Sequence, residues 1–170
     1  TEYFANEIGR LTPGGAFAEF ALPNQNSGPA GITAGPDGNL WFTESSGNRI
    51  GRITPSGVLT EFVVPTANST PRGIVSGPDG ALWFTELAGN RIGRITTAGE
   101  ITEFAIPTAD SQPVGIASGP DGNLWFVELQ GNRIGRITIA GVITEFAMPT
   151  SSDALVSIAA AAAGTLWFRK

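Results

Sequence analysis

Gly-Pro-Asp-Gly-Asn-Leu-Trp-Phe-Thr-Glu, at residues 35–44, runs directly into Ser-Ser-Gly-Asn-Arg-Ile-Gly-Arg-Ile-Thr at 45–54. The same pattern returns every 42 residues along this chain of 170 residues. The Leu-Trp-Phe triplet marks the four copies, at 40–42, 82–84, 124–126 and 166–168. A fixed period between 20 and 50 residues is typical of repeat architectures. The period therefore decides the fold before any single residue does.

Each repeat predicts four short β-strands joined by tight turns. Along one copy the strands are expected at 31–34, 39–44, 49–54 and 58–62. These segments are rich in aromatic and β-branched residues, which favour strands. The Gly-Pro-Asp-Gly segment places Pro and Asp where a type I turn favours them, with a glycine for the left-handed position. Four antiparallel strands in about 40 residues are one blade of a β-propeller.

We therefore predict an all-β fold, with residues 1–170 forming a single β-propeller or half-propeller domain of four four-stranded antiparallel blades. The approximate repeats are 1–42, 43–84, 85–126 and 127–170. A helical solenoid is excluded because no window shows a 3.6-residue period, and 23 Gly and 12 Pro interrupt the chain. A β-sandwich would not repeat one hairpin pair so regularly.

The two ends of the chain are expected to share one blade. Thr1-Glu2 aligns with Thr43-Glu44, so the amino end supplies the third and fourth strands of a blade. The carboxyl end, with Leu-Trp-Phe at 166–168, supplies the first and second strands. The shared blade can close within one chain, as a four-bladed monomer, or between two chains, as an eight-bladed ring. Known propellers have roughly four to eight blades, and we favour the homo-oligomer because four blades demand a tight ring.

Composition excludes several partners and leaves the compartment open. The net charge of −5 argues against a nucleic-acid partner, because proteins bind nucleic acid through a basic surface. No run approaches the 18 or so apolar residues of a membrane span. The absence of His and Cys removes the commonest general base and the thiolate metal sites. A chain that begins at Thr1 is consistent with a removed leader or an excised domain. The composition is compatible with a secreted location and with a cytoplasmic one.

Charged residues that recur in every repeat are expected to serve the blade itself. Arg on the third strand and Glu on the fourth are predicted to pair across the hairpin, and the Asp of each Gly-Pro-Asp-Gly turn to hydrogen-bond its own backbone. The arginine rows are Arg10, Arg52, Arg94, Arg136 and Arg49, Arg91, Arg133; the acidic rows are Glu19, Glu61, Glu103, Glu145 and Asp37, Asp79, Asp121. The fourth repeat is degenerate, with Ala161-Ala162-Ala163-Gly164 at its turn, which indicates a capping blade or a surface altered by a contact.

Five residues remain as candidates for binding. The glutamates that end the second strands lie near one rim, where oxygen ligands suit a hard cation; the alternative is that they cap strand ends and face water. These glutamates are Glu2, Glu44, Glu86 and Glu128. Arg72 departs from the repeat, beside polar linkers that vary from blade to blade, and binding residues favour such loops. Its alternative is a side chain that reaches into solvent.

The string Gly-Pro-Asp-Gly-Asn-Leu-Trp-Phe-Thr-Glu with Gly-Asn-Arg-Ile-Gly-Arg-Ile-Thr resembles the virginiamycin B lyase (streptogramin lyase) family over essentially the whole chain. The resemblance implies a seven-bladed propeller that linearises cyclic depsipeptide antibiotics by magnesium-dependent elimination, with His at the site and acidic residues helping to hold the metal. This chain has four blades' worth of sequence and no His. Where the family often carries His, in Pro-x-Gly-Ile, the residues here are Ala30, Arg72, Val114 and Val156.

The sequence thus favours a non-catalytic propeller, a binding or assembly scaffold of natural or engineered origin, because elimination needs a proton acceptor. No cofactor is expected on this hypothesis, and a small molecule or peptide is the expected ligand of the channel. The alternative is a magnesium-dependent carbon–oxygen lyase acting on streptogramin B-type antibiotics, with Glu44, Glu86 or Glu128 as the base. A partial propeller that completes its ring with a second copy is compatible with the first hypothesis.

Overall fold

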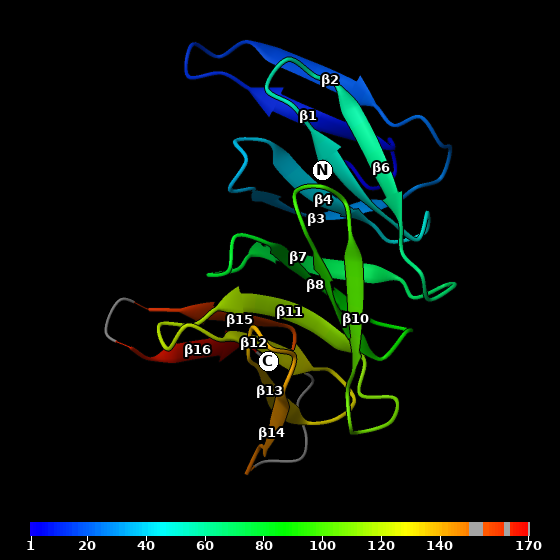
Figure 1. Cartoon of the computed structure of the whole chain (residues 1–170). Helices are drawn as coiled ribbons and strands as arrows, with labels where there is room; N and C mark the ends of the chain where they lie inside the picture. Colours follow the sequence, from blue (N-terminus) through cyan, green and yellow to red (C-terminus); the bar gives the residue numbers. More distant parts are fainter. Residues whose placement is uncertain (150–154, 162–163, 170) are drawn as a thin grey trace.

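The computed structural model describes residues 1–149, 155–161 and 164–169 as an all-β fan of antiparallel sheets (Figure 1). Its strands are β1 Glu7–Leu11, β2 Phe17–Ala21, β3 Pro29–Ala34, β4 Leu40–Glu44, β5 Arg49–Ile53, β6 Leu59–Val63, β7 Pro71–Ser76, β8 Leu82–Glu86, β9 Arg91–Ile95, β10 Ile101–Ala105, β11 Pro113–Ser118, β12 Leu124–Glu128, β13 Arg133–Ile137, β14 Ile143–Ala147, β15 Ser157–Ala160 and β16 Leu166–Arg169. In the described part of the chain, no helix has the length and apolar character needed to cross a membrane.

The sheets are the predicted blades. Three sheets have four strands each in chain order, namely β3–β6, β7–β10 and β11–β14. In the first of them, every strand begins and ends within two residues of the predicted bounds. The innermost strands β3, β7, β11 and β15 are neighbours along the fan. The prediction of an all-β fold made of propeller blades is therefore confirmed.

The Gly-Pro-Asp-Gly turns hold their predicted conformation and make one contact that the sequence did not predict. Gly38 has φ 76°, in the left-handed region that glycine tolerates. The Asp37 carboxylate accepts a hydrogen bond from the Asn39 backbone N–H at 3.2 Å, as expected of an Asp turn. It also accepts one from the indole Nε1 of Trp41 at 3.1 Å. The aspartate therefore anchors the blade's tryptophan as well as its turn.

The hydrophobic core is repeated between neighbouring sheets rather than concentrated at one place. Trp83 of β8 is fully buried and packs in one cluster with Leu124 and Ile137 of the next blade. Its ring stacks on Phe104, with centroids 5.6 Å apart. The guanidinium carbon of Arg94 lies 5.9 Å from the indole, within the range of a cation–π contact. Each blade thus presents a tryptophan, supported by its own Phe and Arg, to the following blade.

A glycine on the third strand makes room for the aromatic ring of the second. A Cβ built on Gly93 of β9 would lie 2.1 Å from the ring of Phe84 in β8. The equivalent glycines Gly51 and Gly135 are in the same position, with Phe42 and Phe126. The repeated Arg-Ile-Gly-Arg-Ile segment therefore needs glycine at its centre because a ring lies directly over that backbone.

The two end sheets are half-blades of two strands each. β1–β2 hold the third and fourth strand positions, and β15–β16 the first and second, as the sequence predicts. Within the described residues they are separate sheets at opposite ends of the fan (Figure 1). Closure of a blade shared by the two ends, within the chain or with a second copy, stays a prediction. The degenerate turn lies partly outside the described residues, at Ala162 and Ala163, but β15 still pairs with β16.

Candidate functional site

The linkers between blades are held by an asparagine on the preceding turn. Asn90 has φ 53°, and its Nδ2 donates to the carbonyl oxygens of Ile106 at 3.3 Å and Thr108 at 2.9 Å. Its Oδ1 accepts from the backbone N–H and the hydroxyl of Ser111, at 2.9 and 2.8 Å. Asn48 makes the same set of bonds to its own linker. These asparagines recur with the period, but their role depends on the linker's fold and could not be deduced from spacing.

We expect Asn90→Ala to destabilise the protein by about 2–4 kcal/mol, because it leaves part-buried backbone groups of the linker unpaired and puts Ala at a left-handed φ. Asn90→Gly keeps the left-handed conformation without strain and loses only the hydrogen bonds, so it should cost less. Chemical denaturation of the two variants checks the order. Equal losses for both would show that the backbone conformation contributes nothing.

The glutamates that end the second strands are not at a solvent-exposed rim. Glu44, Glu86 and Glu128 are 0% exposed in the three complete blades, so the expectation that they face water is wrong there. Their carboxyl oxygens are buried beside a linker serine, Ser27, Ser69 or Ser111, and a glutamate of the fourth strand. The reason is the alternation of side chains along a strand: Glu44 is two residues beyond Phe42, which places both on one buried face.

Each buried glutamate lies beside a glutamate of the fourth strand, and the two have different roles. Glu103 accepts hydrogen bonds from the backbone N–H and the hydroxyl of Thr66, at 2.9 and 2.8 Å. Through both of its oxygens, Glu103 ties the linker of the preceding blade to its own sheet. Burial, and then the Glu103 charge, raise the pKa of Glu86 to about 8. The pKa of Glu44 and of Glu128 is raised to about 7, first by burial and also by the nearby glutamates Glu61 and Glu145.

The recurrent arginines divide into two groups. The predicted pairing between the third and fourth strands is confirmed at Arg49, whose Nε lies 3.8 Å from the Glu61 carboxylate. The other row lies over aromatic rings: the guanidinium carbon of Arg52 is 5.5 Å from the Trp41 ring and 5.7 Å from the Phe62 ring. This second role is a packing role, and it was missed because charge spacing alone suggests ion pairs.

Glu2 is separated from the other candidate glutamates. It lies in the end half-blade, exposed, where its carboxylate and those of Glu7 and Glu19 come within 4.8 Å of one another. In the complete blades the position of Glu7 is an arginine, such as Arg49. Oxygen donors are the type that Mg²⁺ takes, so these three residues fit a hard cation by donor type. The buried glutamates do not fit a shared metal site, because each lies inside its own blade beside a second carboxyl.

Arg72 lies on the inner strand β7 and is exposed, which agrees with the alternative interpretation that its side chain reaches into solvent. Its backbone carbonyl accepts the hydroxyl of Thr43 from the preceding blade at 2.7 Å. A hollow of about 180 Å³ lies between the amino-terminal residues and the first linker, lined in part by Tyr3, Asn26 and Ser46. The structure does not bring Arg72 and the four glutamates together in one site.

The whole chain, residues 1–170, matches the profile of the virginiamycin B lyase family. No curated protein sequence matches it. Among solved structures, it is similar to virginiamycin B lyase from Staphylococcus aureus, with 55% identity and a TM-score of 0.97 over 99% of this chain. A catalytically inactive His-to-Ala variant of that lyase with quinupristin gives the same values.

A streptogramin B lyase structure is similar at 48% identity, with a TM-score of 0.96 over 99% of this chain. A gluconolactonase from Xanthomonas campestris, at 17% identity and a TM-score of 0.76 over 99% of this chain and 64% of its own, shares the fold alone. The chain spans 57% of the staphylococcal lyase and 56% of the streptogramin B lyase.

Proposed function

We propose, on the premise that the chain belongs to the virginiamycin B lyase family, that these 170 residues form a non-catalytic propeller scaffold for binding or assembly. The observation that carries the proposal is the burial of Glu44, Glu86 and Glu128, each 0% exposed. A general base must reach the proton that it abstracts, directly or through one water. Three carboxyls enclosed in separate blades cannot meet a substrate in the channel.

The protonation state of these glutamates supports the same conclusion. With pKa values raised to about 7 to 8, the buried carboxyls are mostly protonated below pH 7, and a protonated carboxyl is a poor ligand for a cation. A His-to-Ala variant of a solved relative is catalytically inactive, and these residues, which span 57% of that relative, contain no histidine. The blades therefore supply a framework, and their variable parts supply any binding.

Binding by this scaffold is proposed at the linker face, where the chain departs from its repeat. Arg72 is exposed there in place of the small or aliphatic residues of the other blades. The hollow beside Tyr3 and Ser46 opens near the first linker and has room for part of a small molecule or peptide. Variable loops on a rigid scaffold are the usual place for such contacts.

A ring-opening assay tests the proposal against the magnesium-dependent lyase. The purified chain is incubated with quinupristin, with and without Mg²⁺, beside the staphylococcal lyase as positive control. We expect no linear product above the rate without protein. Linear product that needs Mg²⁺ and is lost in the Glu86→Gln variant would overturn the proposal and assign Glu86 as the base.

A further inference from the structure

The second linker, residues 66–70 between β6 and β7, is fastened by side chains of two blades. Thr66 donates from its backbone N–H and its hydroxyl to the Glu103 carboxylate of β10, at 2.9 and 2.8 Å. Ser69 is fully buried, and its backbone N–H and hydroxyl donate to the Oδ1 of Asn48 in the preceding blade, at 2.8 and 2.9 Å. The second linker is therefore held at both ends by side-chain hydrogen bonds and not by strand pairing.

The carboxyl group of Glu86 is enclosed beneath this linker. Its side chain is 0% exposed. A Cβ built on Gly89, in the turn after β8, would lie 3.0 Å from Glu86 Oε2 and 2.9 Å from the Cβ of Ser69. The backbone N–H of Gly89 donates to the carbonyl oxygen of Ser69 at 3.1 Å. The turn and the linker thus close over the carboxyl group, and water reaches it only if one of them moves or the blade unfolds.

Among the described residues, two charged groups face the Glu86 carboxyl, Glu103 from β10 and Arg91 from β9. Burial raises the pKa of Glu86 most, and the Glu103 charge raises it further. The Ser69 hydroxyl and the Arg91 charge each lower that pKa by less. One proton between the two carboxyl groups therefore turns a repulsive pair into a hydrogen-bonded one. The uncharged neighbours are Ser69 of the linker, Gly89 of the turn and Pro71, which is opposite Glu86 on β7.

The backbone of the second linker is strained in this position. Asn68 and Thr70 both have φ 55°, in the left-handed region. Thr is β-branched, and a β-branched residue at positive φ is an outlier that the surrounding contacts must impose. The first linker has Gly28 at the equivalent position, with φ 62°, and glycine adopts this conformation without strain. The second linker therefore keeps its conformation only while its contacts hold.

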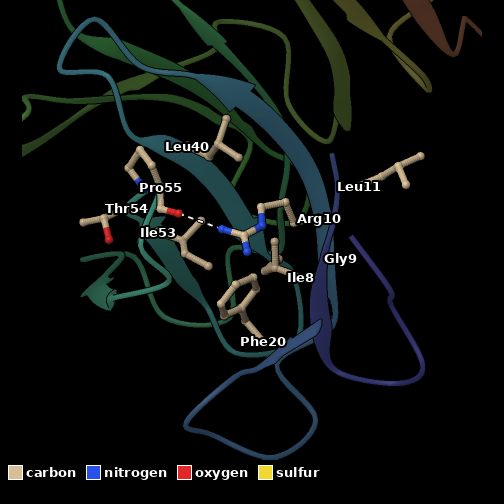
Figure 2. Close-up of a pocket in the computed structure, with 9 residues that line it drawn as sticks. All are labelled: Ile8, Gly9, Arg10, Leu11, Phe20, Leu40, Ile53, Thr54 and Pro55. Carbon is tan, nitrogen blue, oxygen red and sulfur yellow. Dashed lines mark hydrogen bonds between the residues drawn. The ribbon is translucent and has the colours of Figure 1, made fainter. Parts of the chain in front are cut away.

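Other contacts join neighbouring blades independently of the linkers. Figure 2 shows Arg10 of the end half-blade reaching the next blade, where its Nη1 donates to the carbonyl oxygen of Pro55 at 2.8 Å. Arg52 makes the same contact with Thr97 at 3.2 Å, across the interface that the second linker spans. Trp41 is fully buried at that interface, in one cluster with residues of the next blade. The two blades therefore stay joined when the second linker moves.

We propose that the proton between Glu86 and Glu103 is a latch for the second linker: when this proton leaves to solvent, residues 66–70 detach from the turn after β8 while the sheets stay folded. Detachment admits water, which screens the repulsion between the two carboxylates. The linker gives way before the sheets because it carries strain and its residues 67 and 68 are already exposed. This inference goes beyond the proposed function, because it holds with or without a ligand at the linker face.

The latch predicts how opening of the linker depends on pH. The ordinary pKa of a glutamate is 4.5, and burial raises that of Glu86 to about 8 while the linker is closed. The stabilisation of the closed linker is fully present below the lower value and is lost as the pH rises through the upper one. Protection of the Ser69 backbone N–H against hydrogen exchange should fall up to about tenfold per pH unit between these values and level off above about 8. The linkers beside Glu44 and Glu128 should level off above about 7.

Hydrogen exchange followed by NMR on the 170-residue chain, from pH 5 to pH 9, tests the latch. Each rate is corrected for the intrinsic pH dependence of amide exchange. Glu86→Gln has no proton to lose at this position, so its Ser69 amide should keep one level of protection at every pH. Glu100→Gln, at an exposed glutamate of the same sheet, should behave like the wild type. The amides of β8, which has a strand on each side, report unfolding of the sheet.

The comparison between linker and sheet separates a local opening from loss of the fold. A fall in linker protection that leaves β8 better protected at each pH, and that is absent in Glu86→Gln, supports the latch. Linker protection that does not change with pH, an unaltered fall in Glu86→Gln, or equal protection of the linker and β8 overturns it. None of these results bears on the ring-opening assay, so the proposed function fails or stands separately.

Discussion

The free energy of unfolding is expected to fall by several kcal/mol between pH 5 and pH 9. Glu44, Glu86 and Glu128 have a folded-state pKa raised from 4.5 to about 7, 8 and 7 by burial and a neighbouring carboxylate. A raised pKa means that the folded state holds the proton more tightly than the unfolded chain. The stabilisation is therefore fully present below the unfolded pKa and is lost as the pH rises through the folded values.

The size of this fall in the free energy of unfolding follows from the number of carboxyl groups that lose a proton. Each group lowers the stability by at most about 1.4 kcal/mol per pH unit between its two pKa values. Three groups act together above pH 4.5, and the curve should flatten once Glu86 has ionised above about 8. The aspartates of the turns do not oppose this trend. For Asp37, burial raises the pKa, but the hydrogen bonds to Asn39 and Trp41 lower it below 3.8 overall. Such a group is ionised in both the folded and the unfolded state above pH 5, so it adds no pH dependence there.

Urea denaturation at pH 5, 7 and 9 measures the effect, with Glu86→Gln as the matched variant. Gln is close in shape to protonated Glu and cannot ionise, so the variant should lose its share of the pH dependence and be the more stable protein at pH 9. A wild-type stability that stays level from pH 5 to pH 9, with unchanged m-value, would contradict the protonated state of the buried glutamates.

Trp83→Ala is expected to cost about 3–5 kcal/mol, the usual range for deleting a fully buried Trp. The substitution leaves a cavity between two blades and removes the stacking on Phe104, the contact with Arg94 and the hydrogen bond to Asp79. Asp79 keeps its ion pair with Arg94, at 2.7 Å, which limits the loss at that carboxylate.

Trp167→Ala is the control, because Trp167 occupies the same position of the repeat but is 70% exposed. The effect of this substitution on the free energy of unfolding should lie within about 0.5 kcal/mol, as for most surface substitutions. Denaturation curves of both variants give the comparison. Similar losses at the two positions would mean that the cores between blades do not hold the structure together.

The fold could be predicted from the sequence almost completely, because the period carries both the strand order and the turns. Gly35-Pro36-Asp37-Gly38 predicts its turn from local chemistry, and Leu40-Trp41-Phe42 predicts a strand from β-propensity. These signals act within a few residues and need no knowledge of neighbouring blades. The separation of the chain ends into two half-blades follows from the same period.

The candidate site was predicted less well, because the burial of its side chains depends on the residues that cover each face of a sheet. The interpretation of Glu44 as a strand-end cap that faces water is wrong, because its blade is covered on both faces and the side chain is fully buried. The alternation with Phe42 could have indicated this. The partner of each buried glutamate, such as Glu103 with its bonds to Thr66, comes from a different strand and linker and has no signal in the local sequence.

We propose that the glutamates at the ends of the second strands serve the blade and not a catalytic or metal site. An NMR titration of the carboxyl carbon of Glu86, with and without Mg²⁺, tests it most directly. We expect a single titration with a midpoint of about 8 that Mg²⁺ does not move. A midpoint near the ordinary value of 4.5, or a carboxyl signal that shifts on adding Mg²⁺, would contradict it.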